Sequence, residues 1–197
     1  MPADRPAIVV LGGPNGAGKS TAAPRLLRGR LRVDEFVNAD TLAQGLSAFR
    51  PQNAAIEAGR IMLSRLDQLQ RQRQRFAFES TLASLSIARR LARARTAGYR
   101  IHVVFLWLPD VELAVSRVAE RVRSGGHDVP EEAIRRRFWR GRLNFFTRYR
   151  LLADTWRLYD ASPIAGPAPI ASGGARRDLR IRDASVWREA VRGYGDE

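Results

Sequence analysis

The sequence predicts an α/β fold in which a mostly parallel central sheet lies between layers of helices. Short apolar segments rich in β-branched residues alternate along the chain with longer segments of helical periodicity. This alternation is typical of parallel strands that are joined by crossover helices. With 197 residues, of which 45% are hydrophobic, the chain can bury one sizeable core. We therefore expect a single domain over residues 1–197.

The strands are predicted from apolar runs that end at turn signals. The continuous runs at 7–12 and 101–108 are typical of strands that are buried on both faces. Shorter runs at 36–38, 76–79 and 156–161 predict three further strands. These segments supply the strands of the predicted sheet.

Helices are expected in the segments that separate these strands. They are predicted at 19–28, in a stretch that Pro51 opens, at 82–97, in a stretch that Asp110 caps, and in a stretch that Pro130 starts. The last stretch should be buried along Ile134, Phe138, Phe145, Tyr149 and Leu152. Beyond it, we expect an irregular C-terminal segment at about 162–197. Its Pro- and Gly-rich part at 162–174 predicts a loop or a last irregular strand, and a short amphipathic end follows near 186–191.

The composition excludes several kinds of site and of location. The chain has no cysteine, which excludes disulfides, thiolate metal sites and thiol nucleophiles, and its two histidines make a histidine-rich metal site improbable. No apolar run approaches the roughly 20 residues that span a bilayer, and the first six residues lack the features of a signal peptide. We therefore expect a cytoplasmic protein with no membrane partner.

The basic residues indicate an anionic ligand. The formal net charge is +14, which favours a nucleic acid, a nucleotide or an acidic protein as partner. Of the 34 basic residues, 33 are arginines, and the single lysine is Lys19. A lysine kept in such a chain indicates a position that needs a compact ammonium group, which a planar guanidinium imitates poorly.

Lys19 belongs to a phosphate-binding motif. Residues 13–20 match G-x-x-x-x-G-K-[ST], directly after a predicted buried strand and directly before a predicted helix. In that context backbone N–H groups and the helix start bind phosphate oxygens. The predicted ATP-binding residues are Gly13, Pro14, Asn15, Gly16, Ala17, Gly18, Lys19, Ser20 and Thr21, with Lys19 at the β- and γ-phosphates and Ser20 as a Mg²⁺ ligand. ATP is favoured over GTP, because the Asn-Lys-x-Asp guanine motif needs a second lysine.

These observations specify the fold class as a three-layer P-loop NTPase or kinase fold. Ligands of such sheets lie beyond the carboxyl ends of the strands. Asp40 follows the second predicted strand and Glu79 ends the third, so both are candidates for accepting a proton or holding a metal or an acceptor. Two alternatives stay open: Asp40 caps a helix that begins at Thr41, and Glu79 is an exposed strand end.

A helical, arginine-rich lid is predicted over residues 117–140. Arg117 and Arg121 are four residues apart on one predicted helix, and Arg136, Arg137 and Arg140 lie on the next. Glycines 125 and 126 would serve as a hinge between them. Cationic groups on a closing element stabilise the charge that develops in phosphoryl transfer, with Arg121 and Arg137 as first candidates and Arg136 and His127 next. For each arginine alone, a solvated or ion-paired surface position is the alternative.

Four motifs resemble those of the zeta toxin family, in its short zeta-toxin-like branch. They are GPNGAGKST at 13–21, NAD at 38–40, FAFESTL at 76–82 and GGHDVP at 125–130, in the family's order and within a resemblance that covers residues 8–146. The resemblance implies a P-loop kinase, and the best-known members phosphorylate the sugar of UDP-N-acetylglucosamine. It also implies that Asp40 is the catalytic base and that Glu79, Ser80 and Thr81 bind the acceptor. The chain departs from the larger toxins in its short length and in its Gly-Gly-His lid residues.

The leading hypothesis is therefore an ATP- and Mg²⁺-dependent kinase that phosphorylates a hydroxyl of a nucleotide sugar or a similar small molecule. Its catalytic residues would be Lys19, Asp40, Arg121 and Arg137, and its substrate-binding residues Glu79, Ser80, Thr81, His127 and Arg136. One alternative is a nucleic-acid-directed ATP-using enzyme or binding module that uses the basic surface. A third hypothesis, compatible with the first, is the toxin half of a toxin–antitoxin pair with an acidic antitoxin protein as partner.

Overall fold

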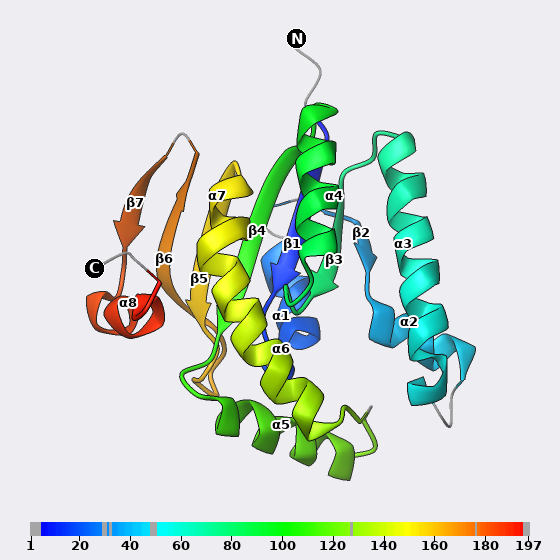
Figure 1. Ribbon diagram of the computed structural model, residues 1–197, viewed down its shortest axis with the longest axis vertical. Helices are drawn as coiled ribbons and strands as arrows, with labels where there is room; N and C mark the ends of the chain where they lie inside the picture. Colours follow the sequence, from blue (N-terminus) through cyan, green and yellow to red (C-terminus); the bar gives the residue numbers. More distant parts are fainter. Residues whose placement is uncertain are drawn as a thin grey trace.

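A seven-stranded sheet runs through the part of the protein that the structure describes (Figure 1). The structure is a computed structural model, and it describes residues 5–28, 31, 33–47, 51–126, 128–175 and 177–194. The strands are β1 (Ala7–Gly12), β2 (Glu35–Val37), β3 (Phe76–Ser80), β4 (Arg100–Trp107), β5 (Thr155–Asp160), β6 (Ala168–Gly174) and β7 (Arg177–Ile181). Their spatial order is β2-β3-β1-β4-β5-β6-β7. The first five strands in this order are parallel, β6 is antiparallel to β5, and β7 is antiparallel to β6.

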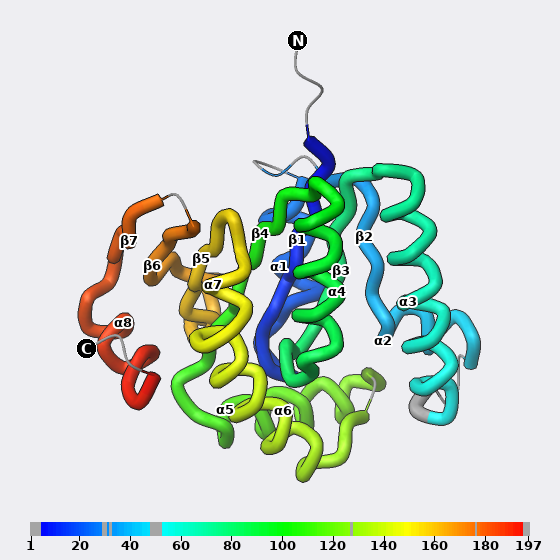
Figure 2. The backbone as a smooth tube through the Cα atoms, turned by 45° about the horizontal axis from the view of Figure 1, so that its top comes forward, coloured from blue at the N-terminus to red at the C-terminus, as the bar shows by residue number. Residues whose placement is uncertain are grey.

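Helices cover both faces of this sheet, which confirms the predicted three-layer α/β fold. The helical elements are α1 (Lys19–Arg28), α2 (Ala39–Leu46), the 3-10 turn η1 (Pro51–Ala54), α3 (Ala55–Arg71), α4 (Leu85–Thr96), α5 (Val111–Arg123), α6 (Glu131–Asn144), the π turn η2 (Phe145–Tyr149), α7 (Arg150–Leu152) and α8 (Ala184–Val191). In Figure 1, α3, α4 and α7 lie in front of the sheet and α1 lies behind it. Figure 2 shows α5 and α6 together at the carboxyl ends of the parallel strands. No helix in the described ranges is long and apolar enough to cross a membrane.

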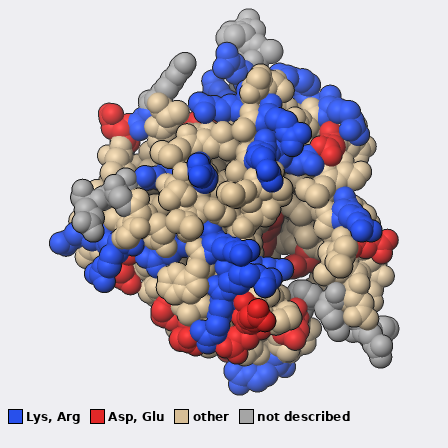
Figure 3. Space-filling model, in the orientation of Figure 1, with Lys and Arg blue, Asp and Glu red and all other residues tan. Residues whose placement is uncertain are grey.

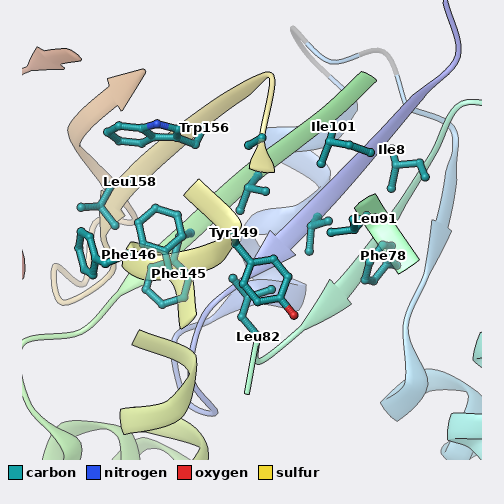
Figure 4. Close-up of a cluster of buried hydrophobic side chains, with 14 of the residues drawn as sticks. Ile8, Phe78, Leu82, Leu91, Ile101, Phe145, Phe146, Tyr149, Trp156 and Leu158 are labelled. Carbon is teal, nitrogen blue, oxygen red and sulfur yellow. The ribbon is translucent and has the colours of Figure 1, made fainter. Parts of the chain in front are cut away.

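The central strands are buried because alternate side chains enter two different cores. Ile8 and Val10 of β1 belong to the core that α3, α4 and α8 cover, whereas Val9 and Leu11 belong to the core beneath α1 and α5. Figure 4 shows the first of these cores, in which the rings of Phe105 and Phe145 stack with their centroids 4.4 Å apart. Burial on both faces explains why β1 and β4 appear in the sequence as continuous apolar runs.

The long helix predicted after Pro130 contributes to both cores. Ile134 and Phe138 of α6 pack with α1 and α5, whereas Phe145 and Tyr149 pack on the opposite side of the sheet. The π turn η2 lies between these two contact regions and changes the direction of the apolar face, since it holds more residues per turn than an α-helix. The predicted burial of this helix is confirmed, and the sequence pattern did not show the π turn.

The prediction of an irregular segment over 162–197 is wrong for the residues of β6 and β7, whereas the short amphipathic end predicted near 186–191 is confirmed as part of α8. β6 and β7 extend the sheet as an antiparallel pair, and α8 packs on it, with the ring of Trp187 stacked on that of Trp156 at 6.0 Å. Gly173 is needed within β6, because a Cβ there would come within 2.8 Å of the Trp156 ring. The glycines that suggested irregularity are therefore positions of close packing within a strand.

One contact region ties α6 and η2 to the loop between β3 and α4. Asn144 donates a hydrogen bond to the carbonyl of Leu82 at 2.8 Å, and the Tyr149 hydroxyl donates to the carbonyl of Ser84 at 2.5 Å. Gly141 lies so close that a Cβ there would collide with the Thr81 carbonyl. The loop that follows β3 is therefore held by a helix residue 62 positions further along the chain.

We expect Gly141→Ala to lower the free energy of unfolding by about 1–3 kcal/mol, because the added methyl group overpacks the contact with Thr81. Gly59→Ala is the matched control. Gly59 also lies within a helix, but a Cβ there meets nothing within 4 Å, so the better helix propensity of alanine should stabilise the protein by about 0.5–1 kcal/mol. Urea unfolding measures both changes. Equal effects of the two substitutions would contradict this account of the contact.

Candidate active site

The loop of residues 13–18 joins β1 to α1 and has the backbone form that its glycines allow. Gly13, Gly16 and Gly18 all have positive φ angles, of 147°, 79° and 70°. A Cβ at Gly13 would come within 2.6 Å of the Leu106 carbonyl oxygen, and one at Gly16 within 2.6 Å of the Ala114 carbonyl oxygen. The loop is therefore packed against β4 and α5, and glycine is required at these positions for both conformation and space.

Lys19 begins α1 and is buried, with 6% of its surface exposed. Its Nζ donates to the Pro14 carbonyl at 2.8 Å and lies 3.5 Å from Oε1 of Glu79. Burial lowers the pKa of Lys19 below its usual range, and the nearby charge of Arg121 lowers it further, while the carboxylates of Glu79 and Asp40 oppose this shift. The ammonium group is thus held between a loop carbonyl and a carboxylate, at the position where a phosphate would bind.

The Glu79 carboxylate connects three elements. Its Oε2 accepts hydrogen bonds from the Ser20 hydroxyl and from the Asn38 amide, each at 2.8 Å, and Asn38 also donates to Ser20 at 3.2 Å. The parallel register of β1 and β3 pairs Leu11 with Glu79, which brings this carboxylate beside the phosphate loop. Glu79, expected in an acceptor-binding segment, contacts the lysine and the hydroxyl of the loop.

Asp40 is not the N-cap of the helix that follows it. Asn38 caps α2, because its Oδ1 accepts from the backbone N–H groups of Asp40 at 2.8 Å and Thr41 at 3.4 Å. The alternative of a purely capping role for Asp40 is therefore wrong. Its carboxylate lies in the first turn of α2, where the helix dipole favours a negative charge.

A cavity of about 190 Å³ collects these groups. It is lined by Asn15, Lys19, Asn38, Ala39, Asp40, Glu79, Ser80, Thr81 and Arg137. Figure 3 shows a hollow with acidic atoms at its floor and basic groups beside it. Larger cavities lie elsewhere on the described surface, but this one joins the phosphate loop to the carboxylates at the carboxyl ends of β2 and β3. We therefore regard it as the candidate active site.

Asn15 contributes an acceptor to this cavity. The residue is buried, and its Oδ1 has no hydrogen-bond partner within the described part of the chain. A buried acceptor without a partner costs about 1–3 kcal/mol, so a ligand N–H or O–H group would relieve this cost.

Among the other loop residues, Ser20 and Thr21 lie exposed in the first turn of α1.

Ser80 and Thr81 follow Glu79 at the end of β3 and line the same cavity. The Ser80 hydroxyl accepts a hydrogen bond from the Leu82 N–H at 3.0 Å, and Leu82 has a φ of 58°, in the left-handed region that leucine rarely adopts. The hydrogen bond from Asn144 to the Leu82 carbonyl holds the same turn. Asn144 therefore positions the segment that lines the cavity.

The first lid helix is tied to the sheet and ends in a hydrogen-bonded turn. Arg117 of α5 donates to the carbonyls of Ala161 at 2.6 Å and Ser162 at 2.7 Å, beyond the end of β5. The N–H groups of Gly125 and Gly126 bond to the carbonyls of Val122 and Arg121, both at 2.9 Å, with a φ of 82° at Gly125. This is the Schellman arrangement, so the two glycines predicted as a hinge cap α5.

The second helix of the predicted lid brings Arg137, and not Arg136, to the cavity. Arg137 of α6 lines it, whereas Arg136 has an exposed side chain that pairs with Glu132 at 3.9 Å. Neighbouring residues of a helix point about 100° apart, so both cannot face the same cavity. Arg121 does not line the cavity, but its charge acts on Lys19. His127 lies outside the described residues.

Sequence analysis therefore identified most lining residues and missed the two asparagines that position them. Asn38 could have been found, because asparagine directly before a helix start is a preferred N-cap. Asn144 lies within a helix 62 residues from its partner Leu82, and no local pattern indicates that contact.

Solved structures with similar folds include those of AvrRxo1-ORF1:AvrRxo1-ORF2 with sulphate ions, at a TM-score of 0.71 and 14% identity, and with ATP, at 0.69 and 14%. Each match covers 95% of this chain and 64% of the other, so the chain spans less than two thirds of those relatives. A structure from the PezAT toxin–antitoxin system of Streptococcus pneumoniae matches at a TM-score of 0.66 and 13% identity, covering 98% of this chain and 81% of that one. At these identities the matches show a shared kinase-like P-loop fold.

Sequence comparison gives the family. An uncharacterized protein of Haemophilus influenzae is 32% identical over 128 residues, which cover 64% of this chain and 88% of that protein. The more specific resemblance to the zeta toxin family stays a prediction. Residues 8–138, from β1 into α6, match the family model described as AAA domain (AAA_33), and the chain therefore belongs to this AAA domain family of P-loop proteins.

Proposed function

We propose that the protein is a kinase that binds ATP at residues 13–21 and transfers the γ-phosphate to a hydroxyl group of a small molecule. The observation that carries this proposal is the single cavity of about 190 Å³ in which Lys19 of the phosphate loop, Asp40, Glu79 and Arg137 meet. A carboxylate and an arginine beside the phosphate loop supply the proton acceptor and the cation that transfer to a hydroxyl requires. The kinase-like fold and the similarly folded structure that contains ATP support the same reading.

In the proposed reaction Asp40 accepts the proton of the acceptor hydroxyl as its oxygen attacks the γ-phosphorus. A new P–O bond forms to the acceptor, the bond to the β-γ bridging oxygen breaks, and ADP leaves. Lys19, Arg137 and Arg121 stabilise the negative charge on the phosphoryl oxygens. Ser80, Thr81 and the Asn15 amide oxygen, which line the same cavity, would contact the acceptor.

Mg²⁺ is part of this proposal because the chain offers suitable ligands. The Ser20 hydroxyl and the Glu79 carboxylate lie 2.8 Å apart beside the phosphate loop, and both are the hard oxygen ligands that Mg²⁺ prefers. No group of three or more His, Asp or Glu residues within the described ranges forms a complete metal site. This fits an ion that takes its remaining ligands from phosphates and water and that shields charge on the transferred group.

A nucleotide sugar such as UDP-N-acetylglucosamine is the proposed acceptor class, and it rests on the resemblance to the zeta toxins. A toxin role with an acidic antitoxin partner is proposed on the same ground. The similar structure from the PezAT toxin–antitoxin system supports it, and the formal net charge of +14 suits an acidic partner.

Asp40→Asn removes the proposed base and keeps the size of the side chain. We expect phosphoryl transfer to fall about 10²–10⁴-fold, with unchanged affinity for ATP. Transfer from labelled ATP to a panel of nucleotide sugars, nucleosides and aminoglycosides measures the first quantity, and calorimetry the second. Asp34→Asn, at an exposed carboxylate before β2, is the control. ATP hydrolysis that needs no acceptor and that Asp40→Asn leaves unchanged would refute the proposal.

Arg137→Ala and Arg136→Ala separate two neighbouring arginines that are both candidate site residues. We expect Arg137→Ala to lower kcat/KM by about 10²–10³-fold, because a cation facing the transferred phosphate is lost. Arg136→Ala should change kcat/KM by less than about twofold, since it removes an exposed ion pair of little energetic weight. Steady-state kinetics with ATP and the identified acceptor decide between them. The reverse order would place Arg136 in the closed site instead.

The affinity for nucleotide should depend on pH through Lys19. Only the protonated ammonium binds phosphate, so affinity is full below the pKa of Lys19 and falls as pH rises through it. Burial lowers that pKa, so the loss should begin at a lower pH than an ordinary lysine, with a pKa of about 10.4, would give. Calorimetric titration with ADP between about pH 7 and pH 10 measures it.

Lys19→Arg is the control for this titration, because arginine keeps its charge over the whole range. The affinity of this variant for ADP should be weaker at neutral pH, because the guanidinium has a different shape, and it should not depend on pH. Parallel curves for both proteins would mean that another group causes the pH dependence.

A further inference from the structure

Two adjoining cavities lie away from the candidate active site. The first, of about 220 Å³, is lined by the first residues of three parallel strands, Ala7 of β1, Arg100 of β4 and Thr155 of β5. It therefore lies at the amino ends of the strands, whereas the phosphate loop follows the carboxyl end of β1. The second, of about 610 Å³, lies over β5, β6 and β7 and shares Thr155, Arg157 and Arg177 with the first. We call the two together the cationic groove.

The groove has a strongly positive lining. Five arginines line the first cavity, namely Arg5, Arg75, Arg100, Arg157 and Arg177, and Arg180 and Arg182 line the second. Among the described lining residues one carboxylate, Asp178, opposes them. His102 also lines the groove, and burial lowers its pKa. The charge of Asp154 raises this pKa, whereas the charges of Arg100, Arg75 and Arg177 lower it. Such a concentration of like charge in a concave site raises the local concentration of anions.

The sheet register arranges part of this charge in a row. Arg157 of β5 pairs with Ser172 of β6, which in turn pairs with Arg180 of β7. Paired residues of neighbouring strands share a face of the sheet, and neighbouring strands lie about 4.8 Å apart. The two arginines therefore lie on the same face at about twice that spacing, with a hydroxyl between them. This spacing suits an extended polyanion that runs across the strands.

The apolar residues of β7 do not take part in the groove. Leu179 and Ile181 alternate with Asp178 and Arg180 along the strand, and Ile181 pairs with Ala171 of the core that the helices cover. The Asp and Glu side chains that an acidic protein would bring are depleted at protein–protein interfaces, whereas nucleic-acid interfaces are polar and rich in positive charge. The composition of the groove therefore favours a nucleic acid over an acidic protein.

Two side-chain types in the groove match the parts of a nucleic-acid strand. Guanidinium groups bind phosphate oxygens through paired hydrogen bonds. Tyr159 lines the second cavity and is half-buried, and an aromatic ring at such a surface stacks on an unpaired base. Bases of a duplex are already stacked and are not free to use it.

We propose that the cationic groove binds single-stranded nucleic acid, with Arg157, Arg177 and Arg180 on the phosphodiester backbone and Tyr159 stacked on a base. The proposal is independent of the proposed kinase activity, because no described residue that lines the groove also lines the candidate active site.

Fluorescence anisotropy of the full chain with a labelled oligothymidylate of about 12 nucleotides tests this proposal, in excess ATP and at about 50–200 mM salt. We expect binding that weakens with salt by about 0.7 logarithmic units per phosphate contact for each tenfold increase. Arg157→Ala/Arg180→Ala should weaken binding at least about tenfold and reduce the slope by about 1.4. The control, Arg89→Ala/Arg93→Ala, removes the same charge from the exposed surface of α4. It should leave the affinity and the salt slope nearly unchanged.

Tyr159→Leu separates stacking from charge. It should weaken binding about tenfold without changing the salt slope, because no phosphate contact is lost. If circular dichroism shows that Arg157→Ala/Arg180→Ala is unfolded, Arg177→Ala/Arg182→Ala tests the same charge at the exposed end of the sheet.

Several results would overturn the proposal. They are the absence of binding at the lowest salt concentration, equal losses in the α4 control, displacement of the oligonucleotide by ATP, and tighter binding of a duplex of the same sequence. Competition by polyglutamate at equal charge concentration would likewise overturn it and would identify an acidic polypeptide as the ligand of the groove.

Discussion

Lys19 holds a positive charge inside the protein, and the surrounding structure compensates for it. An ammonium group that loses its water needs a nearby negative charge and hydrogen-bond acceptors. The Pro14 carbonyl and the Glu79 carboxylate supply them, at 2.8 and 3.5 Å. Glu79 can do so because β3 lies directly beside β1 in parallel register, although 60 residues separate Lys19 from it along the chain. The charge of the buried lysine is therefore balanced only if β3 lies beside β1 in the sheet.

The parts of the fold that could be predicted are those in which local sequence and burial agree. Strands β1 and β4 are buried on both faces and appear as continuous apolar runs, and α5 has a capping aspartate, Asp110, whose carboxylate accepts from the Leu113 N–H at 2.8 Å. Strand β7 could not be predicted, because every described residue of it is exposed and so shows no burial pattern. For β6 the sequence left a loop and a strand open, because its glycines serve contacts with residues such as Trp156 that are distant in sequence.

The sequence could predict the site residues that lie at the ends of strands. Asp40 and Glu79 could be identified because the carboxyl ends of parallel strands meet at one edge of the sheet. What a side chain at that edge touches depends on helix phase and on long-range contacts. Arg136 and Arg137 differ only in phase, and one lines the cavity while the other pairs with Glu132. The hydrogen bond from Asn144 to Leu82 depends on where the end of α6 crosses the loop that follows β3, which no local pattern encodes.

The use of arginine at 33 of the 34 basic positions has a practical consequence for labelling the protein. Lys19 carries the only side-chain amine of the chain, and it lies at the floor of the phosphate loop. Reagents that acylate side-chain amines can therefore modify this protein at one internal position. The extent of that modification, read from the mass of a single peptide, follows the fraction of molecules whose phosphate loop is occupied, with no label on the nucleotide or the protein.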